Sequence, residues 1–181
     1  FKFLYELLSI SKGRLKVNEI PLNFQSRKYG YSKLDYAVIW DFLISAFHTL
    51  INRTIPRKAI SFGLVGATGI LVHLFVVYFL LWITNLTFIQ VLPFAGISAA
   101  SSNFLINNLL TFRKTRLEGI NLFTGLLKFL IVSSIPLMAN VGLASSFYQF
   151  VTPNKFLSQM AGIIVFFIWN YAASSKFVWK D

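Results

Sequence analysis

The segment "NFLINNLLTFRK" (Asn103 to Lys114) recurs in altered form as "NYAASSKFVWKD" (Asn170 to Asp181) near the other end of the chain. An offset of 67 residues (170 − 103) aligns the two halves of the surrounding sequence without a gap. The same offset pairs Phe62 with Phe129, Gly66 with Ser133, His73 with Asn140, Asn107 with Ser174 and Phe112 with Trp179. The chain is therefore predicted to contain an internal repeat.

Each repeat contains two long apolar segments. The chain has 181 residues, is 56% hydrophobic and only 13% charged, and has a mean hydropathy of +0.65, which is too apolar for a soluble domain. A membrane-spanning helix needs about 20 mostly apolar residues. Four segments meet this requirement, at Ile60–Ile83, Ile89–Leu110, Leu126–Phe147 and Phe156–Phe177.

An even number of spans in each repeat means that both repeats enter the membrane from the same side. The predicted fold class is a mainly α membrane protein, with four transmembrane helices arranged as two parallel two-helix repeats. The axis that relates the repeats would lie along the membrane normal. Two helical hairpins packed as a four-helix bundle are the simplest architecture for such a chain.

The distribution of charge predicts the orientation. Of the 17 Lys and Arg residues, 16 fall on one side of the four spans, and only Lys155 falls on the other. By the positive-inside rule we expect a multi-pass protein of the plasma membrane with both termini in the cytoplasm. The net charge of +11 suits an anionic membrane surface, and with this hydrophobicity we expect no nucleic-acid partner.

Several polar residues interrupt the spans. They are His73, Asn103, Asn107, Asn108, Asn140, Gln159 and Asn170. They could form interhelical hydrogen bonds that hold the helices together, or they could line an intramembrane polar pocket between the repeats. His73 and Asn140 occupy equivalent positions and could face one another across the bundle. No Asp or Glu lies within a span, which argues against a proton- or cation-coupled transporter.

The region before the first span has an amphipathic pattern. From Lys33 to Thr54 the polar residues recur on one side of a helix, with an apolar side opposite and Pro56 as the expected end. Such a helix before a span is expected to lie in the cytoplasmic membrane interface. The alternative is a core helix of a soluble domain.

The first 30 residues have a soluble character. Phe1–Ile10 is predicted to form a short buried helix, and Arg14–Phe24 has the alternation of a strand, with Pro21 as an irregularity. These pieces would be the C-terminal remnant of an α/β domain, and the first residue, Phe1, suggests a piece of a longer chain. A compact basic loop follows, which contains Arg27, Lys28 and Lys33.

The segment "VNEIPLNFQSRKYGYSKL" (Val17 to Leu34) resembles the end of the catalytic domain in dolichol-phosphate mannosyltransferases and related polyprenyl-phosphate glycosyltransferases of the family 2 type. The spans are similar to the GtrA-like membrane domain in "FGLVGATGILVH" (Phe62 to His73), "NNLLTFRK" (Asn107 to Lys114) and "WNYAASSKFVWK" (Trp169 to Lys180). The resemblance implies three regions: residues 1–34 as the end of a GT-A-like catalytic domain, 35–57 as amphipathic interface helix and linker, and 58–181 as a GtrA-like four-helix transmembrane domain.

The resemblance also implies a reaction, in which a hexose passes from a nucleotide sugar to the phosphate of a polyprenol or dolichol in the bilayer. The basic loop would bind the lipid phosphate through Arg27, with Lys28, Ser32 and Lys33 as further contacts; a solvated loop near lipid head groups is the alternative. The intact enzyme is expected to use Mg or Mn. This chain contains no Asp-x-Asp motif, no Cys and only two His, so we expect no metal site, no catalytic residue and no cofactor in this fragment.

Three functions therefore stay open. The chain could be the membrane part of a polyprenyl-phosphate hexosyltransferase, whose nucleotide sugar binds through an upstream domain. It could instead be a GtrA-type carrier that moves lipid-linked sugars across the bilayer, or a purely structural membrane anchor.

Overall fold

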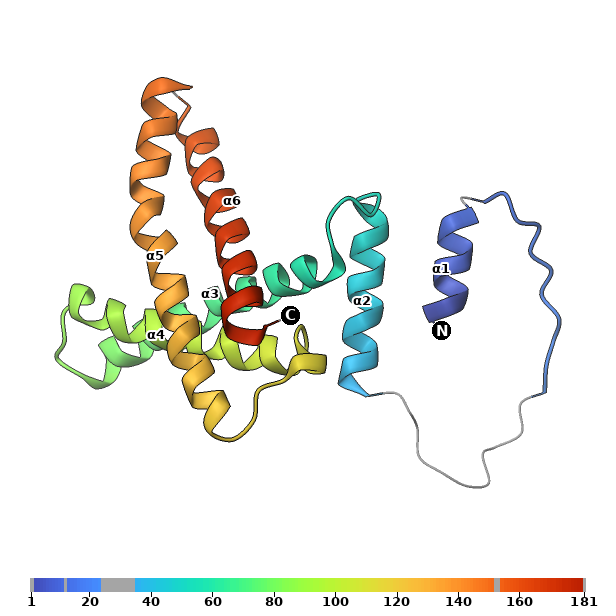
Figure 1. The fold of residues 1–181 in the computed structure, drawn as a ribbon, viewed down its shortest axis with the longest axis horizontal. Coiled ribbons are helices and arrows are strands. Elements are labelled where there is room, and N and C mark those ends of the chain that lie inside the picture. Colours follow the sequence, from blue (N-terminus) through green and yellow to red (C-terminus); the bar gives the residue numbers. More distant parts are fainter. Residues whose placement is uncertain (1, 12, 24–34, 152–153, 181) are drawn as a thin grey trace. The chain divides into compact units, whose positions relative to one another are not determined.

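The computed structural model describes residues 2–11, 13–23, 35–151 and 154–180, apart from the side chains of residues 136–145, 147–148, 155–156 and 158–159. The chain divides into two compact units, Phe1–Ile60 and Ser61–Asp181. Figure 1 shows the helices of both units along the chain.

The described residues of the first unit form α1 (Lys2–Ser11), α2 (Tyr36–Leu50) and the start of α3 at Arg57. The predicted N-terminal helix and the amphipathic helix are both present, but α1 is not buried as predicted, since Phe3 is 79% and Ile10 60% exposed. Asp35 caps α2, because its carboxylate accepts a hydrogen bond of 2.9 Å from the backbone N–H of Val38. The helix ends well before Pro56, since Asn52 and Arg53 adopt the left-handed conformation (φ 52° and 60°), which a right-handed helix cannot continue.

The predicted strand at Arg14–Phe24 is wrong for the residues that the structure describes there. Residues 14–23 form no strand, and all regular elements of the described residues are helical. A strand needs a neighbouring strand to satisfy its backbone groups, and none is present in the described part of the chain. Alternating apolar residues alone were therefore not sufficient evidence for a strand.

The second unit is built from two helical hairpins. The helical elements are α3 (Arg57–Ile83), α4 (Phe88–Leu109), the short 3-10 turn η1 (Arg113–Thr115), α5 (Ile120–Phe150), α6 (Lys155–Ala173) and the π-helical turn η2 (Ser174–Trp179). α3 and α4 pack through Val77, Val91 and Ala95 near the connector that joins them. α5 and α6 lie side by side as an antiparallel pair in Figure 1.

The two hairpins cross and do not lie side by side along their full length (Figure 1). They meet where α3 begins and where α4 and η2 end, because buried rings from all these elements share one cluster. The simple four-helix bundle suggested by the repeat is therefore not the arrangement of the described residues.

Three helical segments among the described residues are long and apolar enough to cross a membrane: Arg57–Ile83, Phe88–Leu109 and Met160–Trp179. They coincide with the first, second and fourth predicted spans. In the third predicted span, Leu126–Phe147, the apolar helical segment with described side chains is Ile120–Ile135, although α5 continues to Phe150. The molecule is a helical membrane protein whose charged connectors lie outside these segments.

Candidate functional site

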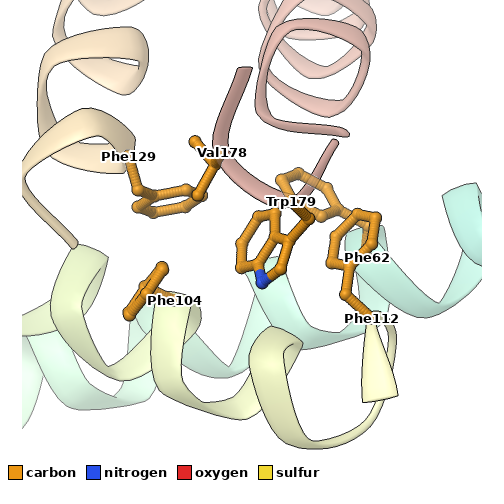
Figure 2. Packing of buried hydrophobic residues seen from close by; sticks show 6 residues of the cluster. All are labelled: Phe62, Phe104, Phe112, Phe129, Val178 and Trp179. Atoms are coloured by element: carbon orange, nitrogen blue, oxygen red, sulfur yellow. The ribbon is translucent and has the colours of Figure 1, made fainter. Parts of the chain in front are cut away.

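The centre of the second unit is a cluster of buried aromatic rings. Its buried members are Phe62, Phe104, Phe112, Phe129, Val178 and Trp179, which come from α3, α4, α5, η2 and the turn between α4 and η1 (Figure 2). Phe112 and Trp179 stack face to face, with ring centroids 4.2 Å apart and planes inclined by 10°. Because Phe112 comes from the first repeat and Trp179 from the second, this stack joins the two hairpins.

The ring contacts follow the 67-residue offset of the repeat. The equivalent rings Phe62 and Phe129 contact each other, with centroids 6.4 Å apart. The equivalent rings Phe112 and Trp179 form the stack with centroids 4.2 Å apart. Four further contacts form two matched pairs: Phe62–Phe112 at 6.3 Å with Phe129–Trp179 at 5.8 Å, and Phe62–Tyr171 at 5.6 Å with Phe104–Phe129 at 5.7 Å. The two hairpins are thus related by an approximate two-fold axis through the cluster.

Both repeats end in a widened helical turn. The N–H of Phe112 donates to Asn107 O at 2.8 Å, and the N–H of Lys180 donates to Ser175 O. Each bond spans five residues, as in a π-helix, and not the four of an α-helix. Such turns are rare and occur often at functional positions. The turns lie next to Phe112 and Trp179, the rings that stack across the two-fold axis.

Asn108 connects three parts of the second unit. Its Nδ2 donates to Leu117 O at 3.0 Å, and its Oδ1 accepts from Leu117 N at 2.8 Å and from Trp179 Nε1 at 3.0 Å. Its side chain is 3% exposed, so these bonds lie out of contact with solvent. We call Asn108, Leu117 and Trp179 the Asn108 clamp, because one amide holds both the α4–α5 connector and the end of the chain's second repeat.

The connector held by the clamp carries exposed cations. Arg113, Lys114 and Arg116 lie on it, and Arg116 Nε lies 3.4 Å from Glu118 Oε1. Both partners of this ion pair are exposed, so it contributes little stability. The clamp therefore places a basic surface segment directly beside the aromatic cluster.

Two of the predicted intramembrane polar residues form hydrogen bonds within their own hairpins. Asn107 Oδ1 accepts from Thr111 Oγ1 at 2.7 Å, and Thr111 in turn lies 2.6 Å from Ser61 Oγ. Both Asn107 and Thr111 are buried, so these groups help to join α3 to α4.

Asn170 makes equivalent contacts in the second repeat. Its Oδ1 accepts from Ser133 Oγ at 2.9 Å and from Ser174 Oγ at 3.2 Å, which joins α5 to α6. Asn103 differs from Asn170, because its Oδ1 is buried and has no hydrogen-bond partner. The three asparagines therefore do not converge on one another, and only Asn103 retains a free buried acceptor among them.

Of the remaining predicted site residues, the structure describes the side chain of His73 only. His73 lies half-buried on α3. Asn140 lies on α5, but its side chain is outside the described residues, so the expected pairing of His73 with Asn140 stays a prediction. The predicted phosphate contacts Arg27, Lys28, Ser32 and Lys33 also lie outside the described residues.

A second group of charged residues lies in the first unit. Arg57 Nη2 forms an ion pair of 2.8 Å with Glu6 Oε1, and Tyr5 packs edge-to-face against Phe42 at 5.2 Å. His48 lies near this pair, and its Nδ1 is buried without a hydrogen-bond partner. Burial lowers the pKa of His48, and the positive charges of Arg57 and Arg53 lower it further.

The apolar side of α2 points outward. Ser45 on the polar side is 1% exposed, whereas Leu50 on the apolar side is 76% exposed and Ile39 and Phe47 are also exposed. A core helix of a soluble protein shows the reverse pattern. The outward apolar side suits a helix that contacts lipid.

No group of three or more His, Cys, Asp or Glu side chains that could hold a metal ion is present in the part of the chain that the structure describes. The metal implied by the resemblance to a glycosyltransferase therefore has no ligand set among these residues.

The sequence placed Asn108 only among the polar residues of the spans, and it gave no special role to Ser61, Thr111, Ser133 or Trp179. The repeat alignment contained the signal for Trp179, since it pairs with Phe112. The three bonds of Asn108 could not be read from the sequence, because they depend on how the α4–α5 connector folds back.

Comparisons with known proteins agree with this architecture. Residues 61–179 match the model of the GtrA/DPMS transmembrane domain. The chain is also 30% identical over 183 aligned residues to a dolichol-phosphate mannosyltransferase of Pyrococcus furiosus, and the alignment covers 99% of this chain and 49% of the relative. The chain thus spans about half the length of this curated relative. From the match over residues 61–179, we conclude that the chain belongs to the family of GtrA/DPMS transmembrane domains.

Proposed function

We propose that this chain is the membrane part of a polyprenyl- or dolichyl-phosphate hexosyltransferase, of the dolichol-phosphate mannose synthase type. The observation that carries the proposal is the extent of the similarity to the Pyrococcus furiosus enzyme. It covers 99% of this chain, and so includes the 60 residues before the family match at 61–179. A carrier or an anchor would need only the transmembrane domain.

The outward apolar side of α2 supports the proposal. A helix with this exposure, placed directly before the first span, would lie in the membrane interface. Lys33 precedes the helix cap Asp35 by only two residues, so the basic loop would lie at the depth of the lipid phosphates. In this arrangement the full set of four spans would form two parallel repeats in the plasma membrane, with both termini in the cytoplasm.

The proposed chemistry explains the basic loop. An oxygen of the lipid phosphate attacks the anomeric carbon of the hexose, the bond from that carbon to the nucleoside diphosphate breaks, and the diphosphate leaves. A phosphate monoester is ionised near neutral pH, so the reaction requires two anionic groups to be held together more than it requires a base. Arg27 would bind the acceptor phosphate bidentately, and Lys28, Ser32 and Lys33 would support it.

The donor side of the reaction would belong to an upstream domain. That domain would bind the nucleotide sugar and a Mg or Mn ion, which neutralises the donor diphosphate when bound.

Arg27 provides the test of this function. Membranes carrying the natural full-length product should transfer a radiolabelled hexose from nucleotide sugar to polyprenyl phosphate. Arg27→Ala should reduce transfer at least about 100-fold, because a charge-assisted bidentate contact worth roughly 3 kcal/mol is lost. Arg14→Ala removes a charge outside the proposed loop and serves as the matched control. Unchanged transfer in Arg27→Ala would contradict the proposed role of the loop.

A GtrA-type carrier for lipid-linked sugars is the second candidate, and the unpaired Oδ1 of Asn103 favours it. A buried acceptor within a span could contact a polar cargo. Vesicles that contain the protein should then accelerate the movement of a fluorescent lipid-linked sugar between leaflets, and Arg27→Ala should leave this movement unchanged. Vesicles with no acceleration and no transfer would leave the structural anchor as the function.

A further inference from the structure

Lys128 is the single charged residue of α5, a helix of 31 residues that contains no Asp or Glu. Its side chain is exposed. It lies eight residues after the helix begins at Ile120, and two residues after the predicted start of the span at Leu126. At a rise of about 1.5 Å per residue, Lys128 lies only about 3 Å inside the apolar span, where its long side chain can extend to the lipid head groups.

The internal repeat gives no packing reason for a lysine at this position. The equivalent residue, 67 positions earlier, is Ser61, which is 5% exposed and whose Oγ lies 2.6 Å from Thr111 Oγ1. The residue equivalent to Thr111 is Val178, which has no hydroxyl. The second repeat therefore has no counterpart of this interhelical bond, and it presents a cation on its surface instead.

Lys128 belongs to an exposed stripe along α5 whose chemistry changes with depth. Its members follow one another at intervals of three, four, three and four residues, which places them on one side of the helix. They are Asn121, Thr124, Lys128, Ile131 and Ile135, and all five are exposed. The stripe is polar near the α4–α5 connector and apolar further along the helix, which is the order of head group and acyl chain in a phospholipid.

We infer that this stripe, which we call the α5 lipid stripe, binds one anionic phospholipid whose head group ends in hydroxyls, as in phosphatidylglycerol. The ammonium of Lys128 binds the phosphate, and Ile131 and Ile135 contact an acyl chain. Asn121 and Thr124 face the hydroxyls of the head group. The inference goes beyond the proposed sugar transfer, because this lipid is neither donor nor acceptor in that reaction.

The polar end of the stripe selects the head group. Thr124 Oγ1 lies 3.3 Å from Ile120 O and 3.2 Å from Asn121 O and donates to these backbone carbonyls, so towards the lipid it is an acceptor. An acceptor suits a hydroxyl donor of the head group. The ammonium of a choline or ethanolamine head group would instead place a second positive charge near Lys128, so zwitterionic phospholipids fit the stripe less well.

The experiment identifies the lipids that stay bound to the protein. The protein is purified in a mild detergent and mixed with equal amounts of phosphatidylglycerol and phosphatidylcholine that carry the same acyl chains. Native mass spectrometry then measures the ratio of the two lipids retained. The wild-type protein should retain phosphatidylglycerol about 5-fold better, as expected for one lysine beside an anionic head group.

Lys128→Gln should lower this ratio to below about 2-fold, because the charge that binds the phosphate is lost. Lys128→Arg should keep the ratio, since a guanidinium also binds phosphate. Lys114→Gln removes the same charge from the exposed connector, so it is the matched control and should keep the ratio as well. Thr124→Val should lower it by about 2- to 3-fold, as for one hydrogen bond in a membrane. All three positions are exposed, so these variants should unfold at the wild-type temperature.

Equal retention of both lipids by the wild-type protein would overturn the inference. An equal loss of the preference in Lys114→Gln and Lys128→Gln would overturn it too, because the attraction would then come from the net charge and not from the stripe. A polyprenyl phosphate added at equal concentration should leave phosphatidylglycerol bound, and its displacement would assign the stripe to the acceptor lipid of the proposed reaction instead. Loss of hexose transfer in Arg27→Ala changes none of these ratios, so the two proposals fail separately.

Discussion

Asn108 illustrates how much one side chain can determine in a membrane domain. Its amide satisfies both backbone groups of Leu117 and the indole N–H of Trp179, at 2.8–3.0 Å. All three partners would lose a hydrogen bond if the amide were removed. In a buried site this loss costs more than the bonds themselves contribute, because the remaining groups stay desolvated.

We predict that Asn108→Ala lowers the free energy of unfolding by about 2–4 kcal/mol, since three partners of one amide are left unpaired at roughly 1 kcal/mol or more each. Unfolding by a denaturing detergent, followed by Trp fluorescence, measures the change. Asn121→Ala, an exposed asparagine at the start of α5, is the matched control and should change stability by less than about 0.5 kcal/mol.

A double-mutant cycle tests the clamp itself. Trp179→Phe keeps an aromatic ring but removes the N–H that Asn108 accepts. If the bond exists, the two substitutions together should cost about 0.5–1.5 kcal/mol less than the sum of the single changes. Strict additivity of the two changes would show that the side chains do not interact.

The sequence identified Asn108 only as one of several polar residues in the spans. For these residues the sequence left interhelical hydrogen bonds and a polar pocket as alternatives, and Asn108 forms hydrogen bonds. Its partners are a backbone segment nine residues away and a ring 71 residues away. No periodic pattern encodes such contacts, because they depend on the path of a connector and on the crossing of two hairpins.

At the scale of elements, α2 exposes most of its apolar residues and buries the polar Ser45 together with Ile44. His48 lies on the inward side, near Arg57 and Glu6. The lowered pKa of His48 means that the folded unit prefers the neutral imidazole. The unfolded chain, with a pKa near 6.5, binds the proton at higher pH than the folded unit does.

The stability of the first unit should therefore fall as the pH drops below about 6.5. Amide hydrogen exchange of α2, corrected for intrinsic rates, should show weaker protection at pH 5.5 than at pH 7.5. The glutamine side chain in His48→Gln cannot become protonated, so this substitution should remove most of the difference in protection between pH 5.5 and pH 7.5. His73→Gln, on the long helix of the other unit, is the control and should retain it.

The elements show where prediction from sequence succeeds and where it fails. The apolar runs located α3 and α4 within a few residues, because hydrocarbon thickness sets their length. α5 begins at Ile120, six residues before the predicted Leu126, since polar residues can continue a helix beyond the membrane. The predicted strand failed because pairing with another strand, and not alternation alone, makes a strand.

At the scale of the whole molecule, the repeat is most visible in its aromatic core. The sequence alignment paired Phe62 with Phe129 and Phe112 with Trp179, and each of these pairs is in contact. The similarity of the halves was thus readable from the sequence. Their crossing was not, because it depends on the sizes of side chains at the contact.

The symmetry of the core has an energetic counterpart. Phe62→Leu and Phe129→Leu should destabilise the domain by similar amounts, about 1–3 kcal/mol each, because each ring takes part in at least three aromatic contacts. Detergent unfolding measures both. Phe94→Leu, whose ring is exposed on α4, is the control and should have little effect. A large effect at one position only would argue against an equal contribution of the two repeats.

The position of Trp179 has a consequence for how the protein is made. The ribosome must add 71 further residues after Asn108 before its indole partner exists. At about 5–20 residues per second, this takes roughly 4–14 s. During that interval the first hairpin would already be inserted, without the hydrogen bond from Trp179 to Asn108 and with its aromatic rings facing lipid. Quality-control proteases of the membrane would therefore have a defined period in which to recognise an unfinished molecule.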